Sequence, residues 1–164
     1  MAEEKEKIMV SIGGGVVEKG KAVLTTYGLG SCLALILYDP STSIGGLAHI
    51  MLPNVLKKRS NLHPYRYCDT AIPYLLESLL KKGAKKESIS AKLAGGAKMF
   101  DALVPKEIMD IGLRNVKAAH KILLLHNIPL IAEDTGGTYG RSITFFLVDG
   151  RVKVSSYHKG IIIL

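Results

Sequence analysis

The chain has 164 residues and a formal net charge of +8, with 48% hydrophobic and 22% charged residues. This composition indicates one folded domain over residues 1–164 and excludes a disordered tail, a collagen-like repeat and a coiled coil. Its apolar runs are much shorter than the roughly 20 residues of a membrane span. The charged N-terminus lacks the apolar segment of a secretory signal, so we expect a cytoplasmic protein without membrane insertion.

The positive charge favours partners with acidic surfaces without identifying them. It gathers in two clusters, Lys57-Lys58-Arg59 and Lys81 to Lys86. Apart from Tyr65 and Tyr67, these clusters lack nearby aromatic residues that could stack on bases, which disfavours nucleic acid as the partner. Solvated loop and helix ends explain the same clusters equally well.

The N-terminal third is predicted to be rich in strands. Its apolar segments of strand length lie at residues 8–17, which three glycines interrupt, and at 21–27, 32–38 and 45–52. Gly28 to Ser31 is interpreted as a hinge, and Asp39-Pro40-Ser41 as a turn. Because the connection after this turn is short, the strands at 32–38 and 45–52 are expected to form an antiparallel hairpin.

A basic loop over residues 57–67 and a first helix are predicted next. Asp69 is the expected N-cap, Pro73 is tolerable only in the first turn, and Gly83 ends the helix. Its apolar residues follow the spacing of a buried stripe, at Ile72, Leu75, Leu76 and Leu79.

A second helix is expected over residues 110–126, with Leu113, Val116, Ala119 and Leu123 on one face. The remaining apolar segments predict strands at residues 89–94, 129–133, 142–148, 151–157 and 161–164. Asp149-Gly150 is a strong hairpin signal. The order of strands, helix, strand, helix and strands predicts an α+β fold with the helices on one side of a mixed sheet.

Cys32 is a candidate nucleophile, although a free cysteine is more often a small buried hydrophobe. Gly30 and Ser31 let the backbone turn sharply before it, so that amide N–H groups could form an oxyanion hole. A strand follows Cys32, and therefore no helix dipole would lower its pKa and a neighbouring base is needed. His49 lies near the end of the strand expected to pair beside Cys32, although a structural histidine is the alternative interpretation.

The residues alone do not decide which group is the third member of this site. Thr25 and Thr26 are expected to end the strand before the cysteine loop, and either a hydroxyl or a backbone carbonyl could orient the imidazole. The spacing of the other histidines predicts no metal site, and the two cysteines form neither a disulfide framework nor a metal motif.

Several motifs together resemble the chemoreceptor glutamine deamidase family, CheD, of bacterial and archaeal chemotaxis. Those of the first half are Thr26 to Cys32, Leu37 to Pro40 and Gly45 to Pro53. The match continues in the same order at Tyr67, Asp69, Ala94 to Phe100, Ile111 to Asn115 and Asp134 to Arg141. The resemblance thus covers nearly the whole chain, and the combination is more specific than any single glycine pair.

The resemblance implies that Cys32 is the nucleophile, His49 its general base, and Thr26 the residue that positions the histidine. It implies deamidation of receptor glutamines through a thioester on Cys32, hydrolysis of glutamyl methyl esters as a second activity, and no metal or organic cofactor. The implied fold is a layered α-β-β sandwich related to the catalytic domains of bacterial glutamine-deamidating toxins. The implied partners are the cytoplasmic domains of chemoreceptors and the phosphatase CheC.

Three other functions are consistent with the same residues. The first is a cysteine amidase or acyl-transfer enzyme that acts on another protein. The second is a non-catalytic module that binds the receptor or CheC. The third, suggested by the charge alone, is a basic RNA-binding domain, whose affinity would fall steeply with salt and would not depend on Cys32.

Overall fold

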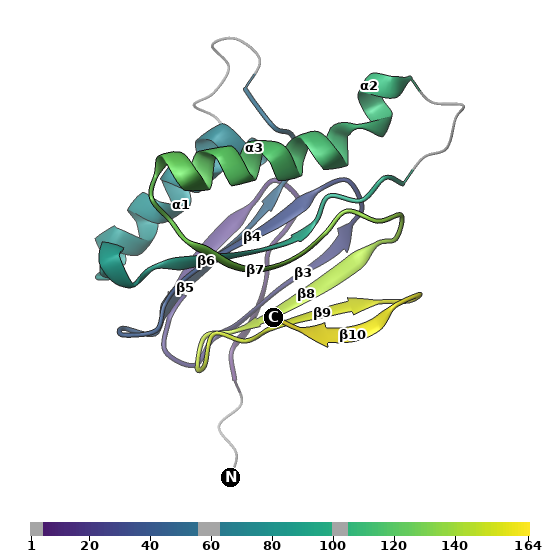
Figure 1. Ribbon diagram of the computed structural model, residues 1–164. Coiled ribbons are helices and arrows are strands. Elements are labelled where there is room, and N and C mark those ends of the chain that lie inside the picture. Colours follow the sequence, from purple (N-terminus) through teal and green to yellow (C-terminus); the bar gives the residue numbers. More distant parts are fainter. Residues whose placement is uncertain (1–4, 56–62, 100–104) are drawn as a thin grey trace.

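The computed structural model describes residues 5–55, 63–99 and 105–164, which form two five-stranded sheets and two long helices (Figure 1). The first sheet, here the outer sheet, has the strand order β1-β3-β8-β9-β10. The second, here the central sheet, has the order β2-β5-β4-β6-β7. Each sheet contains both parallel and antiparallel pairs.

The strands of the outer sheet are β1 (Lys7–Met9), β3 (Val23–Leu29), β8 (Arg141–Phe146), β9 (Val152–Ser156) and β10 (Gly160–Ile163). Those of the central sheet are β2 (Gly15–Lys19), β4 (Leu33–Asp39), β5 (Ile44–Ile50), β6 (Ser90–Gly95) and β7 (Leu130–Thr135). The helices are α1 (Cys68–Lys82), the short α2 (Lys106–Met109) and α3 (Ile111–Leu125), with 3-10 turns η1 (Pro64–Arg66) and η2 (Lys86–Ser88). No helix in these described ranges is long and apolar enough to cross a membrane.

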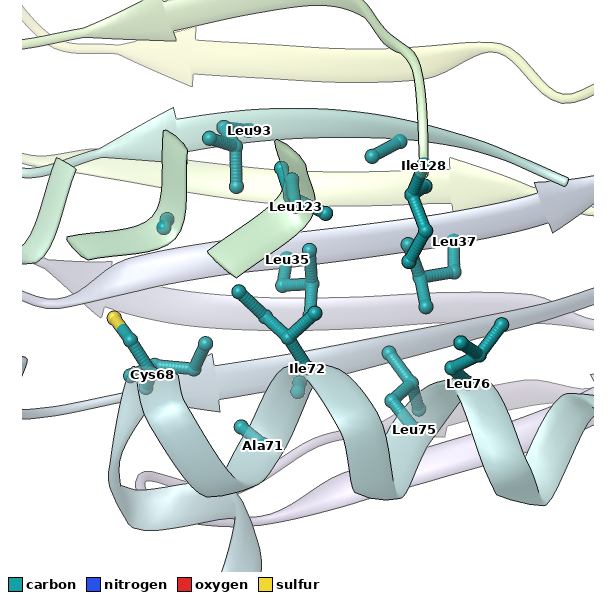
Figure 2. Close-up of a cluster of buried hydrophobic side chains, with 14 of the residues drawn as sticks. Leu35, Leu37, Cys68, Ala71, Ile72, Leu75, Leu76, Leu93, Leu123 and Ile128 are labelled. Atoms are coloured by element: carbon teal, nitrogen blue, oxygen red, sulfur yellow. The ribbon is translucent and has the colours of Figure 1, made fainter. Parts of the chain in front are cut away.

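The helices cover one face of the central sheet, and the outer sheet covers its other face (Figure 1). Side chains of α1 and α3, including Ile72 and Leu123, pack against Leu35 and Leu37 of β4 (Figure 2). A second apolar cluster, which includes Ile36 and Phe145, fills the space between the two sheets. The expected α+β class, with helices on one side, is therefore confirmed, and the layers follow the order helix, sheet, sheet.

The expected apolar segment at residues 8–17 is two strands that belong to different sheets. β1 pairs with β3 of the outer sheet, whereas β2 pairs with β5 of the central sheet. Gly13 lies between them with a φ of +73°, a conformation that non-glycine residues rarely adopt. The chain therefore crosses from one sheet to the other at the glycine run.

Helix α1 begins two residues earlier than expected. Tyr67 rather than Asp69 is its N-cap, and Asp69 lies in the first turn, where its carboxylate accepts the Val55 N–H at 3.2 Å. Pro73 consequently lies inside the helix rather than in its first turn. The predicted apolar stripe is confirmed, since its four members are all buried: Ile72, Leu75, Leu76 and Leu79.

The predicted buried face of the second helix is partly wrong. Leu113 is 53% exposed, whereas Gly112 and Asn115 are buried with the other three members of the stripe. The buried positions of α3 keep the expected helical spacing, but the stripe starts at Gly112 and includes a polar side chain. The apolar pattern did not predict this shift, because it does not treat a polar residue such as Asn115 as buried.

Candidate active site

The hairpin formed by β4 and β5 brings Cys32 and His49 to the same face of the central sheet. In its register, Ala34 lies opposite His49. Cys32 precedes Ala34 by two residues, and side chains two residues apart along a strand share a face. Cys32 and His49 are therefore diagonal neighbours on the face toward the outer sheet. The predicted hairpin is confirmed, although Cys32 lies just before β4 rather than inside it and is only partly buried.

Thr26 reaches the same place from the outer sheet. Its Oγ1 lies 2.7 Å from Nδ1 of His49 and also donates a hydrogen bond to the carbonyl of Val10 at 2.8 Å. Strand β3 does not end at Thr26, as expected, but continues through Gly28 to Leu29. The first half of the predicted hinge, Gly28 and Leu29, is accordingly part of a strand, with an irregular register between Thr26 and Leu29, whereas Gly30 and Ser31 lie outside it.

These two hydrogen bonds fix the tautomer of His49. A threonine hydroxyl has one hydrogen, and the Val10 carbonyl can only accept it. Thr26 Oγ1 must then accept the second bond, so Nδ1 of His49 carries the proton. In the neutral ring this leaves Nε2 with a free lone pair. Nε2 is buried and has no hydrogen-bond partner among the described residues.

Burial keeps the cysteine and the histidine neutral. It raises the pKa of the Cys32 thiol above its usual value and lowers the pKa of His49 below its usual value, because both charged forms are poorly solvated there. The resting pair is therefore a thiol beside an unprotonated imidazole. Such a pair can act when Nε2 removes the thiol proton as the sulfur attacks a substrate.

The backbone on both sides of Cys32 is held by the segment that follows β6. The Ala97 N–H donates to the Gly30 carbonyl at 2.9 Å, and the Gly96 N–H donates to the Cys32 carbonyl at 2.8 Å. Gly95 has a φ of +113°, and a Cβ there would lie 2.3 Å from the Cys32 carbonyl oxygen. Only glycine allows this close approach, which gives Gly95 a structural role.

Asn115 of α3 is a residue of this site that the sequence patterns did not identify. It is fully buried, and its Nδ2 donates to the carbonyls of Ser31 at 2.9 Å and Met51 at 3.1 Å. The first carbonyl precedes Cys32, and the second lies two residues after His49. A polar residue within the helical spacing of the buried stripe was the available signal.

A cavity of about 420 Å³ adjoins the segment that follows β6. It is lined by residues at the ends of β6 and β7 and at the start of α3, including Gly96, Lys98 and Asp110. Gly136 and Gly137 also line it, and both have a positive φ. These glycine pairs thus serve tight turns as well as a pocket wall. Arg141 fixes the second pair, because it is buried and donates to the Gly136 carbonyl at 2.8 Å.

The other candidate features within the described residues have partners outside this site. His120 pairs with Glu133 at 2.7 Å on the surface. Within the described ranges, no three His, Cys, Asp or Glu side chains are grouped so that they could hold a metal ion. The basic cluster at residues 57–59 lies outside the described residues. Lys81 of the other cluster is exposed at the end of α1, where it pairs with Glu77 at 3.0 Å.

Comparisons with known proteins point to one family. The family described as CheD chemotactic sensory transduction matches residues 51–156. A probable chemoreceptor glutamine deamidase CheD from Caldanaerobacter subterraneus is 44% identical over 158 residues, which are 96% of this chain and 98% of that protein. The corresponding protein of Pyrococcus horikoshii is 41% identical over 158 residues, covering 96% of this chain and 97% of its own.

A chemoreceptor glutamine deamidase CheD from Bacillus velezensis is 44% identical over 143 residues, which are 87% of this chain and 86% of that protein. The segment matched by the family starts after Thr26, Cys32 and His49. The similarity to the two relatives above extends over almost the entire chain and therefore includes the β4–β5 hairpin.

Proposed function

The chain belongs to the CheD family, and we propose that it hydrolyses glutamine side chains of chemoreceptors to glutamate through a thioester on Cys32. Chemoreceptor glutamine deamidase is the activity for which its relatives are named. The observation that carries the proposal is the hydrogen-bond chain from the Val10 carbonyl through Thr26 to His49. It leaves Nε2 of a buried imidazole unprotonated on the face that also carries Cys32.

In the first half of the reaction, Nε2 of His49 takes the thiol proton while Sγ of Cys32 attacks the carboxamide carbon of the glutamine. The carbonyl oxygen becomes an oxyanion in the tetrahedral intermediate, and we assign its binding to backbone N–H groups of the Gly30 to Cys32 loop. When the intermediate collapses, His49 donates its proton to the nitrogen. The C–N bond breaks, ammonia leaves, and a glutamyl thioester remains on Cys32.

In the second half, water attacks the thioester carbon and His49 accepts a proton from that water. The C–S bond breaks, the product is a glutamate side chain, and Cys32 recovers its proton from His49. Thr26 keeps Nδ1 protonated and the ring oriented throughout both steps. A glutamyl methyl ester could form the same thioester with methanol as the leaving group, which is the basis for proposing ester hydrolysis as a second activity.

The proposed partners follow from this substrate. The acidic helical bundles that carry the chemoreceptor glutamines would attract a protein with a net charge of +8. Salt would screen this attraction. Because the proposed substrate lies on the cytoplasmic domains of receptors, we propose a cytoplasmic location. The family resemblance adds CheC as a regulatory partner.

The test is mass spectrometry of a receptor cytoplasmic fragment incubated with the native protein, together with an ammonia assay. Glutamine-to-glutamate conversion is expected with the native protein and is expected to be absent with Cys32→Ala. Cys68→Ala is the matched control, because Cys68 is buried in the helix layer and is expected to be dispensable for turnover. If native and Cys32→Ala proteins both bind the fragment and neither changes it, the chain is instead a non-catalytic receptor-binding module.

A further inference from the structure

The peptide bond just before the nucleophile is held by a side chain from a distant helix. Asn115 Nδ2 donates to the Ser31 carbonyl at 2.9 Å across 84 residues of sequence. The carbonyls on either side, at Gly30 and Cys32, accept hydrogen bonds from backbone N–H groups. The orientation of the Ser31 carbonyl therefore depends on one amide side chain.

Fixing this carbonyl also fixes the N–H of Cys32. The peptide between Ser31 and Cys32 is planar and trans, so its C=O and N–H point in opposite directions. With the Ser31 oxygen directed at Asn115, the Cys32 N–H points away from Asn115. Among the described residues, no acceptor is found for this N–H. The described part of the chain thus leaves a backbone donor available on the residue that carries the nucleophilic sulfur.

The second hydrogen of the same amide binds the strand of the base. Asn115 Nδ2 lies 3.1 Å from the Met51 carbonyl, just beyond the end of β5, on which His49 lies. One side chain therefore joins the end of the nucleophile's loop to the end of the base's strand. Both hydrogens of the NH₂ group are used in this way.

The local structure is adapted to bring Asn115 this close. Gly112, one turn earlier on α3, allows the approach, because a Cβ there would lie 2.4 Å from the Ala97 carbonyl oxygen. The Oδ1 atom of Asn115 is buried and has no hydrogen-bond partner within the described part of the chain. A buried amide with an unpaired oxygen is unfavourable. The contribution of asparagine at this position is therefore the pair of hydrogen bonds that its NH₂ group donates.

We propose that Asn115 is a positioning residue that holds the Ser31–Cys32 peptide so that the Cys32 N–H binds the oxyanion formed during deamidation. This inference rests on the proposed function, because an oxyanion arises only when Cys32 attacks a carbonyl compound. A donor on the nucleophilic residue itself lies next to the reacting carbon without any movement of the chain.

The test compares two reactions of Cys32 in Asn115→Leu, a variant with the same branching at Cγ and no side-chain hydrogen-bond donors. Deamidation of a receptor fragment builds an oxyanion, whereas alkylation of the thiol by iodoacetamide does not. We expect kcat for deamidation to fall about 100-fold, with KM within about twofold of the native value. The alkylation rate at Cys32, followed by mass spectrometry from pH 5 to 10, is expected to stay within about threefold at each pH.

Leu123→Ala is the control, since Leu123 is buried on the same helix without contacting the Ser31 or Met51 carbonyl. It should lower the melting temperature and leave the ratio of the two rates unchanged. If Asn115→Leu does not fold, Asn115→Ser takes its place, because a hydroxyl has one hydrogen and cannot bridge both carbonyls. It is expected to show the same selective loss of kcat.

Two results would overturn the inference. The first is a parallel fall of deamidation and alkylation, which indicates general distortion of the site. The second is an unchanged kcat in a folded variant. Absence of glutamate formation by the native protein is a different result, because it contradicts the proposed function itself.

Discussion

The two ends of the β4–β5 hairpin contain buried polar groups with opposite properties. At the end with Cys32 and His49, burial shifts both pKa values toward the neutral forms, and Nε2 of the histidine lacks a partner among the described residues. At the other end lies Asp39, a fully buried residue with an ionised carboxylate. The difference lies in the hydrogen bonds that each end completes.

Asp39 uses both carboxylate oxygens. The backbone N–H of Lys85 donates to Oδ2 at 2.8 Å, and Thr42 Oγ1 donates to the same oxygen at 2.8 Å. Ser41 donates twice to Oδ1, from its N–H and its hydroxyl. Burial alone would raise the pKa of Asp39, but these hydrogen bonds outweigh it and lower the pKa to about 2.

The two ends of the hairpin thus use buried polar groups differently, one for structure and the other for chemistry. A carboxylate with all of its hydrogen bonds formed stabilises the turn between β4 and β5. An imidazole with one nitrogen bound and the other open is oriented and still able to accept a proton. Substitutions at the two ends should therefore have separate effects, one on turnover and the other on stability.

The largest effect is expected for His49→Gln. Loss of the general base should lower kcat for receptor deamidation by about 10³-fold, because the thiol of Cys32 has a raised pKa and is not ionised without help. The midpoint of urea denaturation should change little. His120→Gln is the control, since that histidine lies on the surface. A His49→Gln enzyme with more than a tenth of native kcat contradicts the role of His49.

The second effect is on stability, at the opposite end of the hairpin. Asp39→Ala should lower the free energy of unfolding by about 2 kcal/mol, because a hydrogen-bonded carboxylate is lost and the Lys85 N–H is left unpaired. Turnover should stay within twofold of the native value. Urea denaturation and the ammonia assay on the same preparation check both. A large loss of kcat at native stability would remove the distinction between the two ends.

The contribution of Asp39 to stability should also depend on pH. Its pKa is about 3.9 in the unfolded chain and about 2 in the folded protein. The contribution is therefore complete above about pH 4 and is lost as the pH falls toward 2. The stability difference between native and Asp39→Ala proteins should shrink over that range. A difference that stays constant down to pH 2 contradicts the lowered pKa.

A smaller effect is expected for Thr26→Val, which removes the acceptor of the His49 Nδ1–H and keeps the volume. We expect kcat to fall about 10-fold, since the imidazole remains but its tautomer and orientation are no longer fixed. Thr26→Ser should restore most of the rate. Thr25→Val is the matched control, because its side chain lies on the other face of β3. Equal losses in Thr26→Val and Thr25→Val would indicate a general strand effect.

The smallest effect concerns the pH dependence of turnover. Burial lowers the pKa of His49, so the imidazole stays unprotonated to a pH below its usual value of 6.5. The acid limb of kcat/KM should therefore have its midpoint below pH 6.5 and fall as the pH decreases further. A pH series with the receptor fragment measures it. A midpoint above 6.5 would indicate a stabilised imidazolium rather than a neutral ring.

The sequence patterns predicted the parts of the site that depend on local chain geometry. The turn at Asp39 and the two apolar segments beside it were sufficient to pair β4 with β5, and the pairing places Cys32 near His49. The helix stripe at Ile72 and its neighbours was equally local. In these cases the hydrophobic periodicity and the turn residues fix the geometry over a few residues.

The parts that depend on packing between distant elements could not be predicted in this way. The residues alone left Thr25 and Thr26 equivalent, because the choice depends on which face of β3 meets the central sheet. Asn115 was missed because its partners, Ser31 and Met51, are distant in sequence and lie just outside the strands of the β4–β5 hairpin. Leu113 was placed in the core for the same reason, since only the docked helix shows which stripe is covered.

The position of Thr26 has a consequence for the order of folding. Thr26 belongs to the outer sheet and His49 to the central sheet, so their hydrogen bond forms only when the sheets stack. The outer sheet combines β1 and β3 with β8, β9 and β10 from the end of the chain. Pairings between such distant segments are slow to form compared with a local hairpin. During refolding, we expect turnover to return only after the two halves of the chain have met, later than the secondary structure of the hairpin.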